Sequence, residues 1–274
     1  MTLRLIKFLL GIAVVAFPLQ GNEADRLFYE AVRAEANGEL RNAVDLYLEA
    51  SAFGHSANLH GNLANLYFKL EKYGHSVLHY RKALLFRPDD REFAANLAFA
   101  QEVAGVPNPA ASSTDPAFSA SHTWAWALTL SFFLWGGLTL FAIFLPHRFS
   151  KSSVWSFLTL WIGLIAFLCW ATQQSIQQSH LLTREVIVIH PQSVTVLPNP
   201  DSQVPLRRFA GDGSSANTEV KPGESLFLDL NDQGIPKSHP NAEGMVWYLL
   251  RSQDGKKKGW LKEDEFSPIL GQLD

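Results

Sequence analysis

The segment WAWALTLSFFLWGGLTLFAIFLPHRFSKSSVWSFLTLWIGLIAFLCWA, residues 124–171, contains two apolar runs separated by a short polar connector. No Asp, Glu, Lys or Arg occurs in residues 116–147 or 152–183. As helices, the two runs would be about 33 Å and about 27 Å long, close to the roughly 30 Å hydrocarbon core of a bilayer. We therefore predict transmembrane helices over residues 122–145 and 154–172. The alternative is a helical hairpin buried inside a soluble protein.

The connector between these runs predicts the orientation of the hairpin. Residues 146–153 contain Arg148 and Lys151 and no acidic residue, and positively charged loops remain on the cytoplasmic side of a membrane. We therefore predict that the connector is a cytoplasmic loop. The regions before and after the hairpin are then both predicted to lie on the outer side.

The N-terminus independently indicates the same topology. Arg4 and Lys7 precede the apolar run FLLGIAVVAF, and Pro18 and Gly21 follow it. This order is typical of a secretory signal peptide, so residues 1–21 are predicted to be a signal peptide, with an uncleaved membrane anchor as the alternative. Either version would export the segment that follows.

Composition and motifs exclude several classes of function. The formal net charge of −3 argues against a nucleic-acid-binding protein, which normally has a basic face. A single cysteine, Cys169, excludes an internal disulfide framework. Because no Walker-type loop, GxSxG or HExxH motif is present, we predict no catalytic residue, no metal, no cofactor and no enzymatic activity. His75 and His79 would need a third ligand to hold zinc, and we expect them to be solvated.

Residues 24–104 contain an internal repeat. The segments EANGELRNAVDLYLEASAFGHS and FKLEKYGHSVLHYRKALLFRPDD align with an offset of 33 residues. The offset pairs residues suited to helix crossings: Ala31 with Ala64, Tyr47 with Tyr80, and Ala50 with Ala83. The segment Pro88-Asp89-Asp90 predicts the end of one helix and the start of a capping helix over Arg91–Ala104. Two such repeats and a cap resemble the tetratricopeptide repeat (TPR), a helix–turn–helix unit near 34 residues long. Residues 105–121, rich in Pro, Ser and Ala, are predicted to be a linker.

The resemblance to tetratricopeptide proteins implies a peptide-binding groove, lined by the first helix of each repeat and by the cap. The positions that this rule places on the groove are Phe28, Val32, Asn62, Asn65, Phe68, Asn96 and Phe99. Amides and aromatic rings suit a peptide backbone that carries apolar side chains. The alternative for each of these residues is ordinary packed or solvated surface.

After Arg184 the pattern changes to short runs of β-branched and aromatic residues, namely EVIVIH, SVTVL, ESLFLDL and MVWYLLR. The segment SQDGKKKGWL predicts a β-hairpin. The order of these elements resembles bacterial SH3-like domains, which implies a small all-β barrel over residues 184–270, with residues 207–220 as a variable loop.

In the SH3-like family, Trp and Tyr side chains near the hairpin can form a groove for peptides or cell-wall fragments. Trp247, Tyr248 and Trp260 match those positions, and the alternative for each ring is packing in the barrel core. The hairpin tip carries Lys256, Lys257 and Lys258. We expect a solvated tip, with a surface for an anionic partner as the alternative.

The predicted fold class is therefore a multidomain membrane protein with an α-helical TPR array, a two-helix transmembrane hairpin and a small all-β SH3-like barrel. This order of domains resembles the BatE-type proteins of bacterial aerotolerance operons. The resemblance implies a non-enzymatic scaffold of the bacterial inner membrane. Both soluble parts would lie in the periplasm and assemble with membrane proteins that contain von Willebrand factor A domains and with a MoxR-type ATPase. The alternative is a cell-wall sensor or targeting protein whose SH3-like domain binds peptidoglycan.

Overall fold

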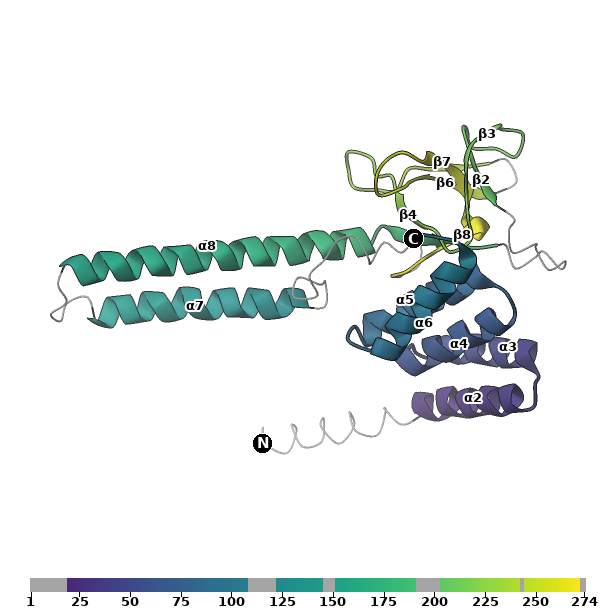
Figure 1. Cartoon of the computed structure of the whole chain (residues 1–274), viewed down its shortest axis with the longest axis horizontal. Helices are drawn as coiled ribbons and strands as arrows, with labels where there is room; N and C mark the ends of the chain where they lie inside the picture. Colours follow the sequence, from purple (N-terminus) through teal and green to yellow (C-terminus); the bar gives the residue numbers. More distant parts are fainter. Residues whose placement is uncertain (1–18, 108–121, 145–150, 191–202, 242–243, 272–274) are drawn as a thin grey trace, which may run out of the picture.

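The computed structural model describes residues 19–107, 122–144, 151–190, 203–241 and 244–271. Within them the chain forms a stack of helices, an apolar helical hairpin and an antiparallel β-sheet (Figure 1). Figure 1 shows the hairpin projecting away to one side, while the helical stack and the sheet lie together at its base. Most of the predicted signal peptide, most of the linker and residues 146–150 of the predicted loop lie outside the described residues.

The helical region consists of five consecutive helices: α2 (Leu19–Ala36), α3 (Leu40–Ser51), α4 (Ala57–Lys69), α5 (Tyr73–Phe86) and α6 (Arg91–Ala104). The Ser56 hydroxyl caps α4 by accepting from the amide of Leu59 at 3.2 Å. The Asp90 carboxylate caps α6, so the helix predicted over Arg91–Ala104 is confirmed. Helix α2 begins at Leu19, however, so residues 19–21 are helical, and cleavage after Gly21 would cut through α2.

The residues paired by the 33-residue offset lie where the helices cross. All six are buried, with exposed fractions of at most 4 %. The phenyl ring of Phe28 on α2 packs edge-on against Tyr47, with ring centroids 5.3 Å apart. Small residues allow close helix approach and the tyrosines fill the remaining space, which explains why these positions recur in the sequence. The structure therefore shows two helix pairs, α2–α3 and α4–α5, followed by α6.

The apolar runs form α7 (Thr123–Phe144) and α8 (Lys151–Leu182), which pack against each other. Both are long and apolar enough to cross a membrane, and hardly any of their apolar side chains are covered by the rest of the protein. Phe132 and Leu160, for example, are 73 % and 77 % exposed. Core helices of a soluble protein would bury such side chains, so this exposure disfavours the soluble alternative.

The two apolar helices approach each other closely around Trp161. The indole Nε1 of Trp161 on α8 donates to the carbonyl oxygen of Phe133 on α7 at 3.0 Å. A Cβ atom at Gly137 would lie 2.1 Å from that nitrogen, so a larger residue there would displace the Trp161 indole. Helix α8 also continues ten residues past the predicted end of the span at residue 172. It leads into the first strand with only Thr183 and Arg184 between.

The β region contains eight strands: β1 (Glu185–Val188), β2 (Val204–Arg207), β3 (Ala216–Val220), β4 (Ser225–Leu228), β5 (Ser238–Pro240), β6 (Val246–Arg251), β7 (Lys258–Lys262) and β8 (Phe266–Pro268). All described pairings are antiparallel. The strand order β3-β2-β7-β6-β4-β1-β8 ends at β3 and β8, with β5 paired to β6 beside this path. The prediction of a closed SH3-like barrel is therefore wrong in this respect, because the sheet is not closed.

Of two predictions for the β region, one is corrected by the structure and one is confirmed. Residues 207–220, predicted to be a variable loop, include β3 and form an antiparallel hairpin with β2. The predicted hairpin at Asp254-Gly255 is confirmed, because β6 and β7 pair on either side of it. The run SVTVL lies outside the described residues.

Strand β1 is buried on both faces. Its side chains alternate, since successive residues of a strand point to opposite sides. Val186 and Val188 belong to the core cluster of the sheet. Ile187 belongs to a different cluster, together with Val77 and Leu97 of the helical region. The helices therefore cover the second face of this strand, and the two regions share a hydrophobic core.

Three polar or close contacts accompany this shared core. The Arg81 guanidinium on α5 pairs with the Glu185 carboxylate on β1 through Nη2, at 2.6 Å and 2.5 Å to the two oxygens. A Cβ atom at Gly74 would lie 2.9 Å from the carbonyl oxygen of Val188 and 3.1 Å from the amide nitrogen of Gly223. The backbone of α5 at Gly74 therefore lies directly against the backbone of the β region at Val188 and Gly223. The absence of a side chain at Gly74 allows this approach.

Candidate functional site

The predicted groove residues lie on α2, α4 and α6, the first helix of each pair and the cap. A salt bridge of 2.8 Å between Lys69 and Glu35 joins α4 to α2. The rings of Phe68 and Phe99, 5.4 Å apart, join α4 to α6. These two contacts link α4 to both of the other helices. We call the predicted residues on the three helices, taken together, the α2–α4–α6 surface.

Two asparagines on α4 hold complementary hydrogen-bonding groups on this surface. Asn62 donates through Nδ2 to the hydroxyl of Tyr47 at 2.9 Å, which leaves its Oδ1 as an acceptor. Asn65 accepts through Oδ1 from the hydroxyl of Tyr80, which leaves its Nδ2 as a donor. Because the two residues are three apart on a helix, they are neighbours on its surface. Together they offer one acceptor and one donor, as the N–H and C=O groups of a peptide require.

Apolar side chains flank these amides. Phe99 and Val32 are 55 % and 41 % exposed. Phe68 and Asn96 are half-buried, and Phe28 is held in place by its contact with Tyr47. All seven predicted positions thus lie on the same three helices. Those that keep exposed area form a mixed amide and aromatic surface.

The three rings predicted to bind ligand in the β region differ in how deeply they are buried. Trp247 is fully buried, under the Arg207 guanidinium, which lies 4.8 Å from the ring centroid. Tyr248 is 9 % exposed and packs edge-on against Phe266. Only Trp260 is half-buried. In this conformation Trp247 and Tyr248 pack in the core, which is the alternative to a ligand groove.

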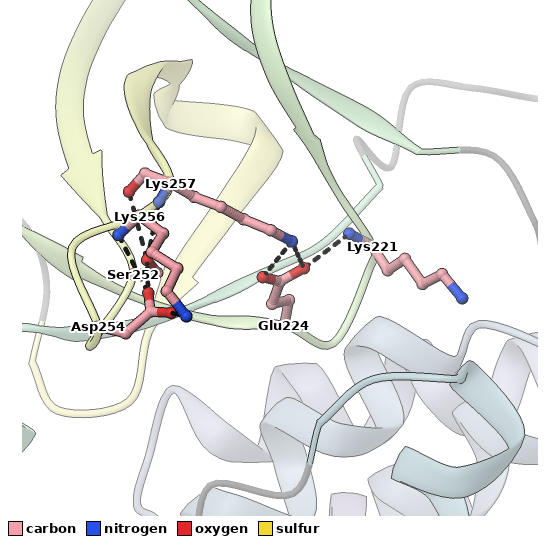
Figure 2. Close-up of polar contacts among 6 residues, drawn as sticks. All are labelled: Lys221, Glu224, Ser252, Asp254, Lys256 and Lys257. Atoms are coloured by element: carbon pink, nitrogen blue, oxygen red, sulfur yellow. Dashed lines mark hydrogen bonds and ion pairs between the residues drawn. The ribbon is translucent and has the colours of Figure 1, made fainter.

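The hairpin-tip lysines are paired rather than free. Figure 2 shows Lys257 reaching the Glu224 carboxylate, at 2.7 Å and 2.9 Å, and Lys256 beside Asp254. Lys258 pairs with Asp229 at 2.9 Å. Hydrogen bonds from Ser252 and from the Lys256 amide and ammonium lower the pKa of Asp254 to about 2, so this acid remains charged beside Lys256. The tip is thus a neutralised set of ion pairs, which weakens the case for an anionic partner here.

Sequence reasoning missed a cluster of buried imidazoles in the helical region. The prediction that His75 and His79 are solvated is wrong, because both are at least 94 % buried. The Nδ1 atoms of His79 and His60 are 3.1 Å apart. His75 and His79 both stack on the ring of Tyr67, at centroid distances of 4.8 Å and 5.3 Å. The exposed His55 stacks on His60 in turn.

The surroundings of these imidazoles favour their neutral form. Burial, followed by the charges of Lys82 and His55, lowers the pKa of His60 to about 4. Burial also lowers the pKa of His75 to about 4 and that of His79 well below its ordinary value. Desolvation disfavours the charged imidazolium and is the leading cause in each case. Within the described residues, no group of three or more His, Cys, Asp or Glu side chains is arranged to hold a metal ion.

No family model, curated protein or solved structure matches this chain. The proposed function therefore rests on the arrangement of the protein's own residues.

Proposed function

We propose that this protein is a non-enzymatic membrane scaffold that binds an extended segment of a partner protein on its α2–α4–α6 surface. The observation that carries the proposal is the pair of amides on α4. Asn62 presents an acceptor and Asn65 a donor, on the helix whose Phe68 packs against the exposed Phe99. A peptide backbone needs both kinds of group, and exposed aromatic rings add apolar contact area for its side chains.

The proposed location is the bacterial inner membrane, with α7 and α8 spanning it and the connector in the cytoplasm. The contact between α5 and β1 supports the topology, because two regions that share a core must lie on the same side of a membrane. In this proposal both regions are periplasmic. The partner class follows the resemblance to BatE-type proteins, namely membrane proteins with von Willebrand factor A domains that work with a MoxR-type ATPase.

The α2–α4–α6 surface is favoured over the β region as the binding site. Two of the three rings predicted for a cell-wall-binding groove pack in the core of the sheet, and the hairpin lysines are neutralised by carboxylates. A peptidoglycan-binding sensor would therefore have to rely on Trp260 without those rings.

Photocrosslinking in cells tests the proposed surface. With a benzophenone amino acid in place of Phe99, we expect a defined set of crosslinked membrane proteins. Asn65→Ala should weaken this capture by about tenfold or more, since loss of a central contact at an interface typically costs about 2 kcal/mol. The control is the same amino acid at Phe86, which is 49 % exposed on α5, outside this surface. Equal capture at both positions, or capture unaffected by Asn65→Ala, would show that the partner does not bind on this surface.

A further inference from the structure

Helix α5 carries two different contacts on its two sides. His75 and His79 contact α4 through Tyr67 and His60. Gly74, Val77 and Arg81 contact the β region through Val188, Gly223 and Glu185. The buried histidines and the junction with the sheet therefore share one helix, and a change on one side of α5 reaches the other within a turn.

We propose that the buried histidines of α4 and α5 form an acid-sensitive switch that releases the helical region from strand β1. The trigger is uptake of protons by the contact between His60 and His79. The response is a displacement of α5, which separates Arg81 from Glu185. Displacing α5 also moves Tyr80, whose hydroxyl donates to Asn65 on the α2–α4–α6 surface. The switch is nevertheless tested without any partner, so its outcome does not depend on the proposed function.

The hydrogen bond between His60 and His79 can accept only one added proton before it breaks. With Nδ1 atoms 3.1 Å apart, one ring donates its Nδ1 hydrogen and the other accepts it. A first added proton can occupy the Nε2 atom of the donor ring and leave this hydrogen bond intact. A second must occupy the accepting Nδ1, which then places two N–H groups against each other. Both rings would also be charged, and like charges in a buried site repel strongly.

The charged or titratable groups that act directly on His60 and His79 are all basic and oppose their protonation. His55, just before α4, stacks on His60, and Lys82 and His75 on α5 also act on the pair. Lys72 and His190 act on His75. Asp45 on α3 acts on Tyr67, where after burial it raises the pKa of the phenol. Within the described part of the chain, no carboxylate contributes to the pKa of His60 or His79.

The pH window of the switch follows from linkage. An unfolded imidazole takes up its proton near pH 6.5, whereas folded His60 resists until the pH reaches about 4. The lowered folded-state pKa means that the released form binds more protons. The docked form is therefore fully stable above pH 6.5 and loses stability as the pH falls from there toward 4. Release is expected inside that interval.

The contact between α5 and the sheet cannot adjust to a displacement of α5. At Gly74, added atoms would already meet backbone of Val188 and Gly223 at 2.9 Å and 3.1 Å, so tilting the helix on this side causes a steric clash or separation. Tightly packed contacts of this kind have discrete arrangements and do not deform continuously. Loss of the contact as a unit is therefore the expected response.

The experiment measures docking of the full-length protein in nanodiscs as the pH is lowered. In a Cys169→Ala background, cysteines at Asn58 and Gln253, both exposed, carry spin labels for distance measurement. We expect the distance to change with a midpoint between pH 4 and pH 6.5. The double variant His60→Gln/His79→Gln keeps polar groups but cannot take up protons, and should shift the midpoint down by about one pH unit or more.

His239→Gln is the matched control, since His239 is exposed on β5, and it should leave the midpoint unchanged. An unchanged midpoint in the double variant, or a wild-type distance that stays constant down to pH 4, overturns the switch. Should the double variant misfold at pH 7.5, NMR titration of the wild-type imidazoles decides. His60 and His79 that protonate near pH 6.5 while the labels stay docked overturn the proposal, and protonation only on release supports it.

Discussion

Arg81→Met is expected to destabilise the folded chain by about 3–5 kcal/mol, the usual cost of leaving one member of a buried ion pair without its partner. The Glu185 side chain is 6 % exposed and the Arg81 side chain 20 % exposed, so water cannot replace the lost guanidinium. The Ser225 hydroxyl also donates to Glu185, at 2.7 Å, but it carries no compensating charge. Chemical denaturation of the full-length protein in detergent measures the loss.

Two further variants separate this burial effect from a general effect of losing a charge. Lys69→Met removes the salt bridge to Glu35, whose lysine is 52 % exposed, and should cost about 0–1 kcal/mol. Arg81→Met combined with Glu185→Met should recover most of the stability, because it leaves no buried charge without a partner. If Arg81→Met costs no more than Lys69→Met, the pair does not hold the two regions together.

Gly74→Leu is expected to detach α5 from the sheet. The atoms nearest to an added Cβ are the Val188 carbonyl oxygen, the Pro222 Cβ and the Gly223 amide nitrogen, at 2.9–3.1 Å. Backbone atoms cannot rotate away as a side chain can, so the cost should reach or exceed the roughly 1–3 kcal/mol typical of overpacking. The Gly223 amide donates to the Val188 carbonyl at 2.7 Å within the β region, beside Gly74. Its hydrogen exchange should become faster once α5 no longer covers this part of the sheet.

Gly54→Leu is the control for this substitution. An added Cβ at Gly54 meets no atom within 4 Å, and its backbone does not require glycine. Protection of the Gly223 amide should therefore be the same as in the wild type. Unchanged protection in Gly74→Leu as well would mean that the close approach at this position does not limit docking.

The elements themselves were largely predictable from local sequence. Asp90 after Pro88 predicts the start of α6, and the 33-residue offset predicts which alanines and tyrosines are buried at helix crossings. The two charge-free runs predict α7 and α8 because length and apolarity suffice for such helices. These features follow from capping residues, an internal repeat and long apolar runs, which can be read directly from a single sequence.

Features that depend on contacts between distant segments were not predicted. The open strand order depends on pairings between strands that are far apart in the chain, and the burial of His75 and His79 depends on how α4 packs against α5. One signal was present, because EVIVI is almost continuously apolar, as is usual for a strand covered on both faces. Its exception, Glu185, needed a cationic partner, but nothing local indicates that Arg81 supplies it.

The central claim is that the helical region and the β region lie docked together on the outer side of one membrane. Labelling of single cysteines with a membrane-impermeant maleimide in spheroplasts tests it most directly, again in the Cys169→Ala background. Cysteines at Asn58 and Gln253 should both react before lysis, and a cysteine at Ser152, within the connector, only after it. Labelling of Asn58→Cys and Gln253→Cys from opposite sides, or of Ser152→Cys from outside, would contradict the account.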